Sequence, residues 1–72
     1  MIREGTRIKV ALLKANKTQL WLIDKLGERG INTSKTEMSS VLNGNRRGNK
    51  ADLILTESIR ILQDNELARP NS

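Results

Sequence analysis

Apolar residues recur at helical spacing in four segments of the chain. Their stripes predict a helix near residues 6–15, two short helices near 19–26 and 35–42, and a longer helix near 50–64. The residues expected on the core-facing side are Ile8, Ala11, Leu12, Ala15, Leu22, Ile23, Leu26, Met38, Val41, Leu42, Ala51, Ile54, Leu55, Ser58, Ile59 and Leu62. No stretch alternates with a period of two, so we expect no sheet. The pattern therefore predicts a compact all-α fold of four helices, with room for a fifth.

Capping residues flank these stripes. Residues that suit an N-cap precede three of the helices, namely Thr6, Thr18 and Ser34. Ser34 and Glu37 have the spacing of a capping box, in which each side chain bonds the backbone N–H of the other residue. Residues that commonly end a helix follow three of the stripes, namely Asn16, Gly27 and the pair Asn43-Gly44.

A chain of 72 residues has the size of one small domain. We expect the domain to cover residues 1–65, and residues 66–72 to form a flexible tail. The longest apolar run has four residues, Leu20 to Ile23, whereas a membrane span needs about 20. No apolar stretch of signal-peptide length opens the chain. We therefore expect no contact with a membrane and a location in the cytoplasm of a bacterial host.

The composition argues against enzymatic chemistry. The chain has no Cys and no His, so it has no disulfide, no thiolate or imidazole ligand for a metal, and no Cys or His nucleophile. Its eight acidic residues show no paired placement in an apolar segment, and it has no Gly-rich phosphate loop. We expect no catalytic residue, no metal and no cofactor.

The formal charge of +5 is unevenly distributed. Residues 1–17 and residues 29–50 carry +4 each, whereas residues 18–28 carry −1 and residues 51–72 carry −2. Clustered cations suit a phosphate backbone, because each neutralised phosphate releases counterions. The charge alone fits a solvated surface equally well, so the positions of the cations on the helices must decide.

The pair of short helices, residues 18–43, is the most informative unit. Its first half has the sequence Thr18-Gln19-Leu20-Trp21-Leu22-Ile23-Asp24-Lys25-Leu26-Gly27. Its second half ends with Met38-Ser39-Ser40-Val41-Leu42-Asn43, and the residues that follow it are Gly44-Asn45-Arg46-Arg47. Over about residues 7–47 the chain resembles the phage repressor/Cro family of lambda-repressor-like helix-turn-helix proteins. Three departures stand out: the turn from Glu28 to Thr33 is longer, Ile23 replaces a small residue, and Leu20 and Trp21 occupy positions that are commonly polar.

The resemblance implies a double-stranded DNA operator as partner, with the second short helix in the major groove. Gln19 would reach a phosphate or brace that helix. Base edges would be contacted by Lys35, Thr36 and Ser39 or Ser40. Glu37 would either accept a hydrogen bond from a cytosine amino group or cap its own helix, and capping is the favoured role. The phosphate backbone would be contacted by Asn43, Asn45, Arg46 and Arg47.

Trp21 is the only aromatic residue, and DNA binding explains it least. One interpretation is that it packs against the first or the last helix as part of the core. The other is that Leu20 and Trp21 form a protein-binding anchor, since Trp is enriched at interface centres. Leu13, Leu53 and Ile61 lie off the predicted stripes, so some of this apolar surface is expected to be buried in a homodimer or with another protein.

Two functions follow, both in a phage lysis–lysogeny switch. The first is a small Cro-like transcriptional regulator that binds operator DNA. The alternative is an antirepressor, since the size and helix-turn-helix layout also resemble the small modulator-of-repression proteins of temperate phages of Gram-positive bacteria. That resemblance implies binding to the DNA-binding domain of the phage repressor. The basic loop Arg46-Arg47 and Lys35 favour DNA, and Trp21 favours a protein partner.

Overall fold

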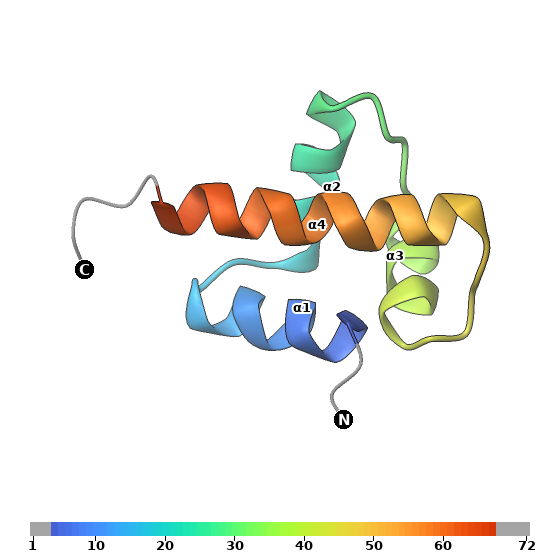
Figure 1. Ribbon diagram of the computed structural model, residues 1–72, viewed down its shortest axis with the longest axis horizontal. Coiled ribbons are helices and arrows are strands. Elements are labelled where there is room, and N and C mark those ends of the chain that lie inside the picture. The colour runs from blue at the N-terminus through green and yellow to red at the C-terminus, as the bar shows by residue number, and fades with distance from the viewer. Residues whose placement is uncertain (1–3, 68–72) are drawn as a thin grey trace.

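The computed structural model describes residues 4–67, with side chains described as far as Asn65. It contains four helices, which are α1 (Glu4–Lys14), α2 (Gln19–Glu28), α3 (Lys35–Leu42) and α4 (Asn49–Leu67) (Figure 1). Between residues 4 and 67 there is no strand and no further helix. The prediction of an all-α, four-helix domain is therefore confirmed.

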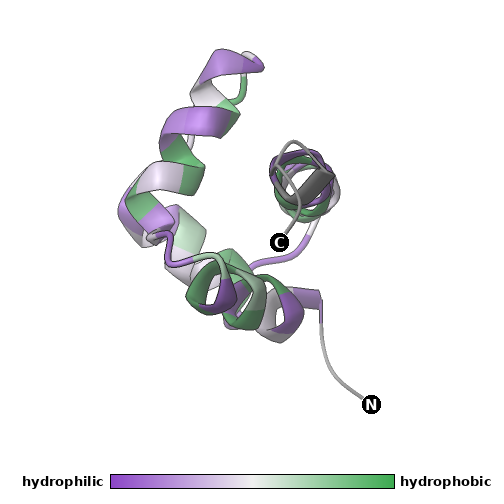
Figure 2. Cartoon of the chain, turned by 90° about the vertical axis from the view of Figure 1, so that its left-hand side faces the viewer, coloured by the Kyte–Doolittle hydropathy of each residue, from purple (hydrophilic) through white to green (hydrophobic). Residues whose placement is uncertain are grey.

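The first and last helices of the chain pack together and form the base of the fold. α1 and α4 contact each other and run in the same direction, and α2 and α3 pack against both α4 and one another (Figure 1). Viewed from the side, α4 is seen end-on, with the other three helices around one flank of it (Figure 2). Each short helix of the central pair therefore has a neighbour that fixes its position.

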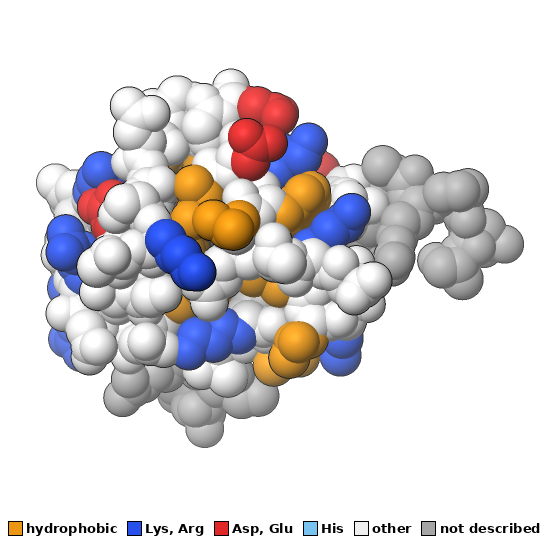
Figure 3. Space-filling model, turned by 180° about the vertical axis from the view of Figure 1, so that it is seen from behind, with side chains coloured by type: hydrophobic (Ala, Val, Ile, Leu, Met, Phe, Trp, Pro, Cys, Tyr) orange, Lys and Arg blue, Asp and Glu red, His pale blue; other side chains and the backbone are white. Residues whose placement is uncertain are grey.

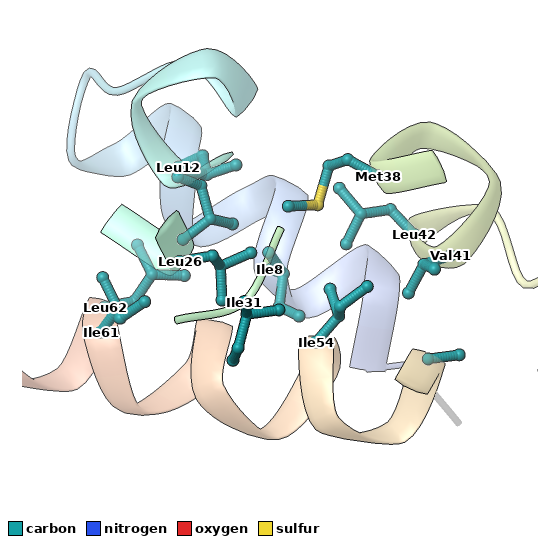
Figure 4. Close-up of a cluster of buried hydrophobic side chains, with 12 residues drawn as sticks. Ile8, Leu12, Leu26, Ile31, Met38, Val41, Leu42, Ile54, Ile61 and Leu62 are labelled. Atoms are coloured by element: carbon teal, nitrogen blue, oxygen red, sulfur yellow. The ribbon is translucent and has the colours of Figure 1, made fainter. Parts of the chain in front are cut away.

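Side chains from all four helices meet in one core (Figure 4). The fully buried large side chains at its centre are Ile8, Leu22, Leu26, Met38, Leu42 and Ile54. Ile31, from the connection between α2 and α3, completes the cluster. Burying such side chains is the main stabilising contribution in a domain of this size, at about 1.5–3 kcal/mol each before the loss of chain entropy.

Three helices end in the same way, with a residue at positive φ just after the helix. These residues are Asn16 (φ 58°), Gly30 (φ 82°) and Gly44 (φ 79°). In each case the next residue donates its N–H to the carbonyl five positions back, as Ile31 does to the Leu26 carbonyl at 2.9 Å. The stops predicted at Asn16 and at Asn43-Gly44 are confirmed. The stop predicted at Gly27 was wrong, because α2 continues to Glu28 and turns at Gly30.

Two of the three predicted N-caps are present. The Thr18 hydroxyl accepts a hydrogen bond from the Trp21 N–H, and the Ser34 hydroxyl accepts one from the Glu37 N–H. The N-cap predicted at Thr6 was wrong, because α1 already begins at Glu4. Gly5, expected to precede the helix, is instead a buried helical residue that lies directly against the backbone of Leu42.

α4 is longer than predicted, and its burial pattern differs from the prediction at three positions. It continues to Leu67, so the first two residues of the expected tail, 66 and 67, are helical. The rest of that tail, residues 68–72, lies outside the described part of the chain. Ile61, expected to be off the stripe, is only 5% exposed and belongs to the core, whereas Leu55 and Ile59 are half-buried. No helix within residues 4–67 combines the length and apolar character needed to cross a membrane.

Candidate nucleic-acid interface

A hydrogen bond joins the first turn of α2 to the middle of α3. The Ser39 hydroxyl donates to Oε1 of Gln19 at 3.3 Å, and both side chains are half-buried. Of the two roles expected for Gln19, bracing α3 is the one seen in the structure. Because this bond adds to the apolar contacts of α3, it fixes the angle at which α3 presents its outer surface.

The outer surface of α3 is polar and carries short side chains. Met38, Val41 and Leu42 face the core and are buried. Thr36, Ser40 and Asn43, which follow at i, i+4 and i+7, form the opposite strip, with Ser40 half-buried and the other two exposed. Lys35, at the start of α3, is also exposed. Hydroxyl and amide groups of this kind both donate and accept hydrogen bonds, and their short side chains allow close approach by a partner.

The carboxylate of Glu37 does not cap its own helix, which was the favoured of its two expected roles. Oε1 lies 3.2 Å from Nζ of Lys50, and Oε2 lies 3.7 Å from a guanidinium nitrogen of Arg46. The Glu37 side chain is only 14% exposed, and it makes no hydrogen bond to the Ser34 N–H, so the capping box is only half formed. Glu37 instead links the first turn of α3 to the start of α4, and it partly neutralises Arg46 of the basic loop and Lys50 of α4.

Other cations surround α3 without a carboxylate partner. Nζ of Lys9, on α1, donates a hydrogen bond to Oδ1 of Asn43, just after α3. Lys35 and Arg47 are exposed, and neither forms an ion pair within the described residues. Asn45 is exposed in the same loop. Positive charge thus flanks both ends of α3, although less of it is free than the sequence indicates.

Arg29 holds the end of α2 to α4. Its guanidinium lies 2.9 Å from Oε1 of Glu57 and 3.1 Å from Oδ2 of Asp64. The hydrogen bond that Arg29 donates to Glu57 is the main cause that raises the pKa of Arg29 above its ordinary value, and the bond that it donates to Asp64 adds to it. Since Arg29 immediately follows α2, these bonds anchor the connection that leads to α3.

Trp21 packs against the edge of the core and stays partly exposed. The indole is half-buried against the core, and it lines a hollow of about 300 Å³ with Ile61 of α4. The ammonium groups of Lys17 and Lys25 lie 5.3 Å and 6.0 Å from the ring centroid, within the range of a cation–π contact. Leu20, the other half of the predicted anchor, is 59% exposed. The apolar surface next to Gln19 therefore belongs to Leu20.

Further apolar side chains are exposed on α1 and α4. Leu13 on α1 is 78% exposed, and Leu53 on α4 is 47% exposed. Seen from behind, hydrophobic side chains lie in the open among lysine and arginine side chains (Figure 3). The burial of this apolar surface in a homodimer or against another protein therefore stays a prediction.

Sequence reasoning missed the contacts that join distant segments. Lys9 and Asn43 are 34 residues apart, and no local pattern indicates that they meet. Within residues 4–67 no three acidic side chains are grouped as metal ligands. A scan against protein-family models gives no match to this chain, and searches of curated proteins and of solved structures give none either.

Proposed function

We propose that this protein is a small Cro-like transcriptional regulator of a phage lysis–lysogeny switch, which binds operator DNA with α3 in the major groove. The observation that carries the proposal is the braced pair α2 and α3, in which the bond between Gln19 and Ser39 orients a polar strip outward. A rigid helix of this kind is what major-groove recognition needs, because base contacts depend on a fixed docking angle.

Each part of the interface has a distinct role in the proposal. Thr36 and Ser40 approach base edges and form hydrogen bonds there, and Lys35 suits the acceptors of guanine. Asn43, Asn45 and Arg47 lie beside the phosphate backbone and set the register. Lys9 adds a phosphate contact that the sequence did not indicate. On a palindromic operator two copies of the chain would bind, so we expect a homodimer on DNA.

The test starts from DNA that the protein itself selects from a random-sequence duplex library. Fluorescence anisotropy then measures affinity for the selected duplex at several salt concentrations. The double variant Lys35→Ala, Arg47→Ala removes two unpaired cations beside α3. Its salt dependence should be shallower by about one phosphate contact, that of Arg47, with weaker binding throughout.

The matched control is Lys25→Ala, Arg60→Ala, which removes one lysine and one arginine away from α3. Both of these residues form ion pairs with neighbouring carboxylates on their own helices. The control should bind DNA nearly as the unaltered protein does. Enrichment of no sequence, or an equal loss in both double variants, would contradict the proposal.

The alternative function, an antirepressor that binds the DNA-binding domain of the phage repressor, is favoured by Leu20. This side chain is exposed beside Gln19, where DNA binding would place a charged phosphate backbone rather than an apolar surface. Leu20→Ala should then weaken a complex with the repressor, whereas Leu13→Ala, an equally apolar change on α1, should not. A gel shift with the protein alone, the repressor alone and both together distinguishes the functions. Loss of the repressor's shift, with no shift from this protein, supports antirepression.

A further inference from the structure

A groove of about 450 Å³ lies between α1 and α4, on a surface that the proposed DNA contacts do not use. Its apolar lining comes from both helices. The residues that supply it are Ile8, Val10, Ala11, Ala15, Ile59 and Leu62. Val10 is 42% exposed, and Leu62 is buried. Because α1 and α4 run side by side in the same direction, the groove is bounded by a helix on each side (Figure 1).

Two cations of α1, Arg7 and Lys14, lie along one side of this groove at helical spacing. Arg7, Val10 and Lys14 lie on one strip of α1, and seven residues correspond to two turns, or about 10 Å. Neither Arg7 nor Lys14 has a carboxylate within 4 Å in the part of the chain that the structure describes. The remaining polar lining is the pair of amides Gln63 and Asn65, so no carboxylate lines the groove among the side chains described, which end at Asn65.

We infer that this groove is a docking surface for an acidic amphipathic helix of a partner protein. An amphipathic helix binds a groove through apolar residues at i, i+3, i+4 and i+7. Carboxylates two turns apart on the edge of that helix would match the spacing of Arg7 and Lys14. Charge complementarity therefore sets both the class of partner and its orientation, since a basic or neutral helix would leave the two cations unpaired.

The probe for this surface is a synthetic amphipathic peptide with leucines at that spacing and glutamates two turns apart. Titrated into isotope-labelled full-length protein, it should shift the amide NMR signals of Val10, Ala11, Lys14 and Ile59. A second peptide with lysines in place of the glutamates should shift none of them. The double variant Arg7→Gln, Lys14→Gln should bind the acidic peptide about three- to thirtyfold more weakly, the range expected for two exposed ion pairs.

The control variant Lys17→Gln, Arg60→Gln has the same net charge as the double variant Arg7→Gln, Lys14→Gln but leaves the groove intact. It should therefore bind the acidic peptide as tightly as the unaltered protein does. Equal binding of the acidic and basic peptides would overturn the inference. Shifts at the groove that depend on the concentration of the protein alone would also overturn it, because they would assign the groove to a second copy of the chain. Since the test uses no DNA, its outcome is separate from that of the proposed function.

Discussion

Gly5→Ala tests how closely α1 approaches α3. A Cβ at position 5 would lie 2.0 Å from the carbonyl oxygen of Leu42, and 2.7 Å from its carbonyl carbon. Both are backbone atoms, so they cannot rotate aside as a flexible side chain would. The start of α1 and the end of α3 must therefore separate by about 1 Å, in a core that is packed as densely as a molecular crystal.

Two opposing effects set the size of the change. Alanine is favoured over glycine inside a helix by up to about 1 kcal/mol. Forcing an extra methyl group into a packed site costs about 1–3 kcal/mol, and separating the helices weakens further contacts. We expect the overpacking to prevail, with a net loss of about 1–2 kcal/mol. In a domain of this size that corresponds to a fall in Tm of about 4–8 °C for each kcal/mol.

Urea denaturation followed by far-UV circular dichroism measures the change, and the fluorescence of Trp21 supplies a second probe. Gly27→Ala is the matched control, because Gly27 lies within α2 and a Cβ there would meet nothing within 4 Å. It should raise the free energy of unfolding by about 0.5–1 kcal/mol. If Gly5→Ala is as stable as the unaltered protein, or more stable, the close approach of α1 to Leu42 is refuted.

Three further changes test other contacts. Ser58→Ala should raise the free energy of unfolding by about 1 kcal/mol in urea, because the described residues give this fully buried hydroxyl no hydrogen-bond partner. Arg29→Ala should lower Tm, and the difference should shrink at high salt, because it removes two ion pairs between the end of α2 and α4. Under the DNA proposal, Glu37→Gln should tighten binding and steepen its salt dependence in anisotropy titrations, because it frees two cations.

Local patterns predicted the helices well, because both their apolar stripes and most of their caps are encoded within a few residues. Gly27 and Gly30 show where this local information ends. Either glycine can end a helix, and the choice depends on Ile31, which must reach the core beside Leu26. A turn at Gly30 places Ile31 directly after it, where the Ile31 N–H donates a hydrogen bond to the Leu26 carbonyl. The deciding contact is tertiary, so the sequence pattern alone could not select it.

The candidate interface was predictable in its residue types but not in its charge. The bond between Gln19 and Ser39 agrees with the bracing role expected from the helix-turn-helix resemblance. Lys9 contributes to the same surface only because α1 packs beside the end of α3. Trp21 was ambiguous for the same reason, since its burial depends on where the last turns of α4 lie.

Glu37 determines what kind of partner the surface of α3 can hold. Its carboxylate pairs with Arg46 of the basic loop and Lys50 of α4, so these two cations attract phosphate less than unpaired cations at the same positions would. Short neutral groups and a few free cations remain around α3. If this surface binds DNA, the affinity must come mainly from fit in the groove, and its salt dependence must be shallow. The low charge also suits a protein partner seated against the exposed Leu20, where apolar burial would drive binding. A complex with DNA should therefore weaken as salt rises, even if slowly, whereas a repressor complex centred on Leu20 should not.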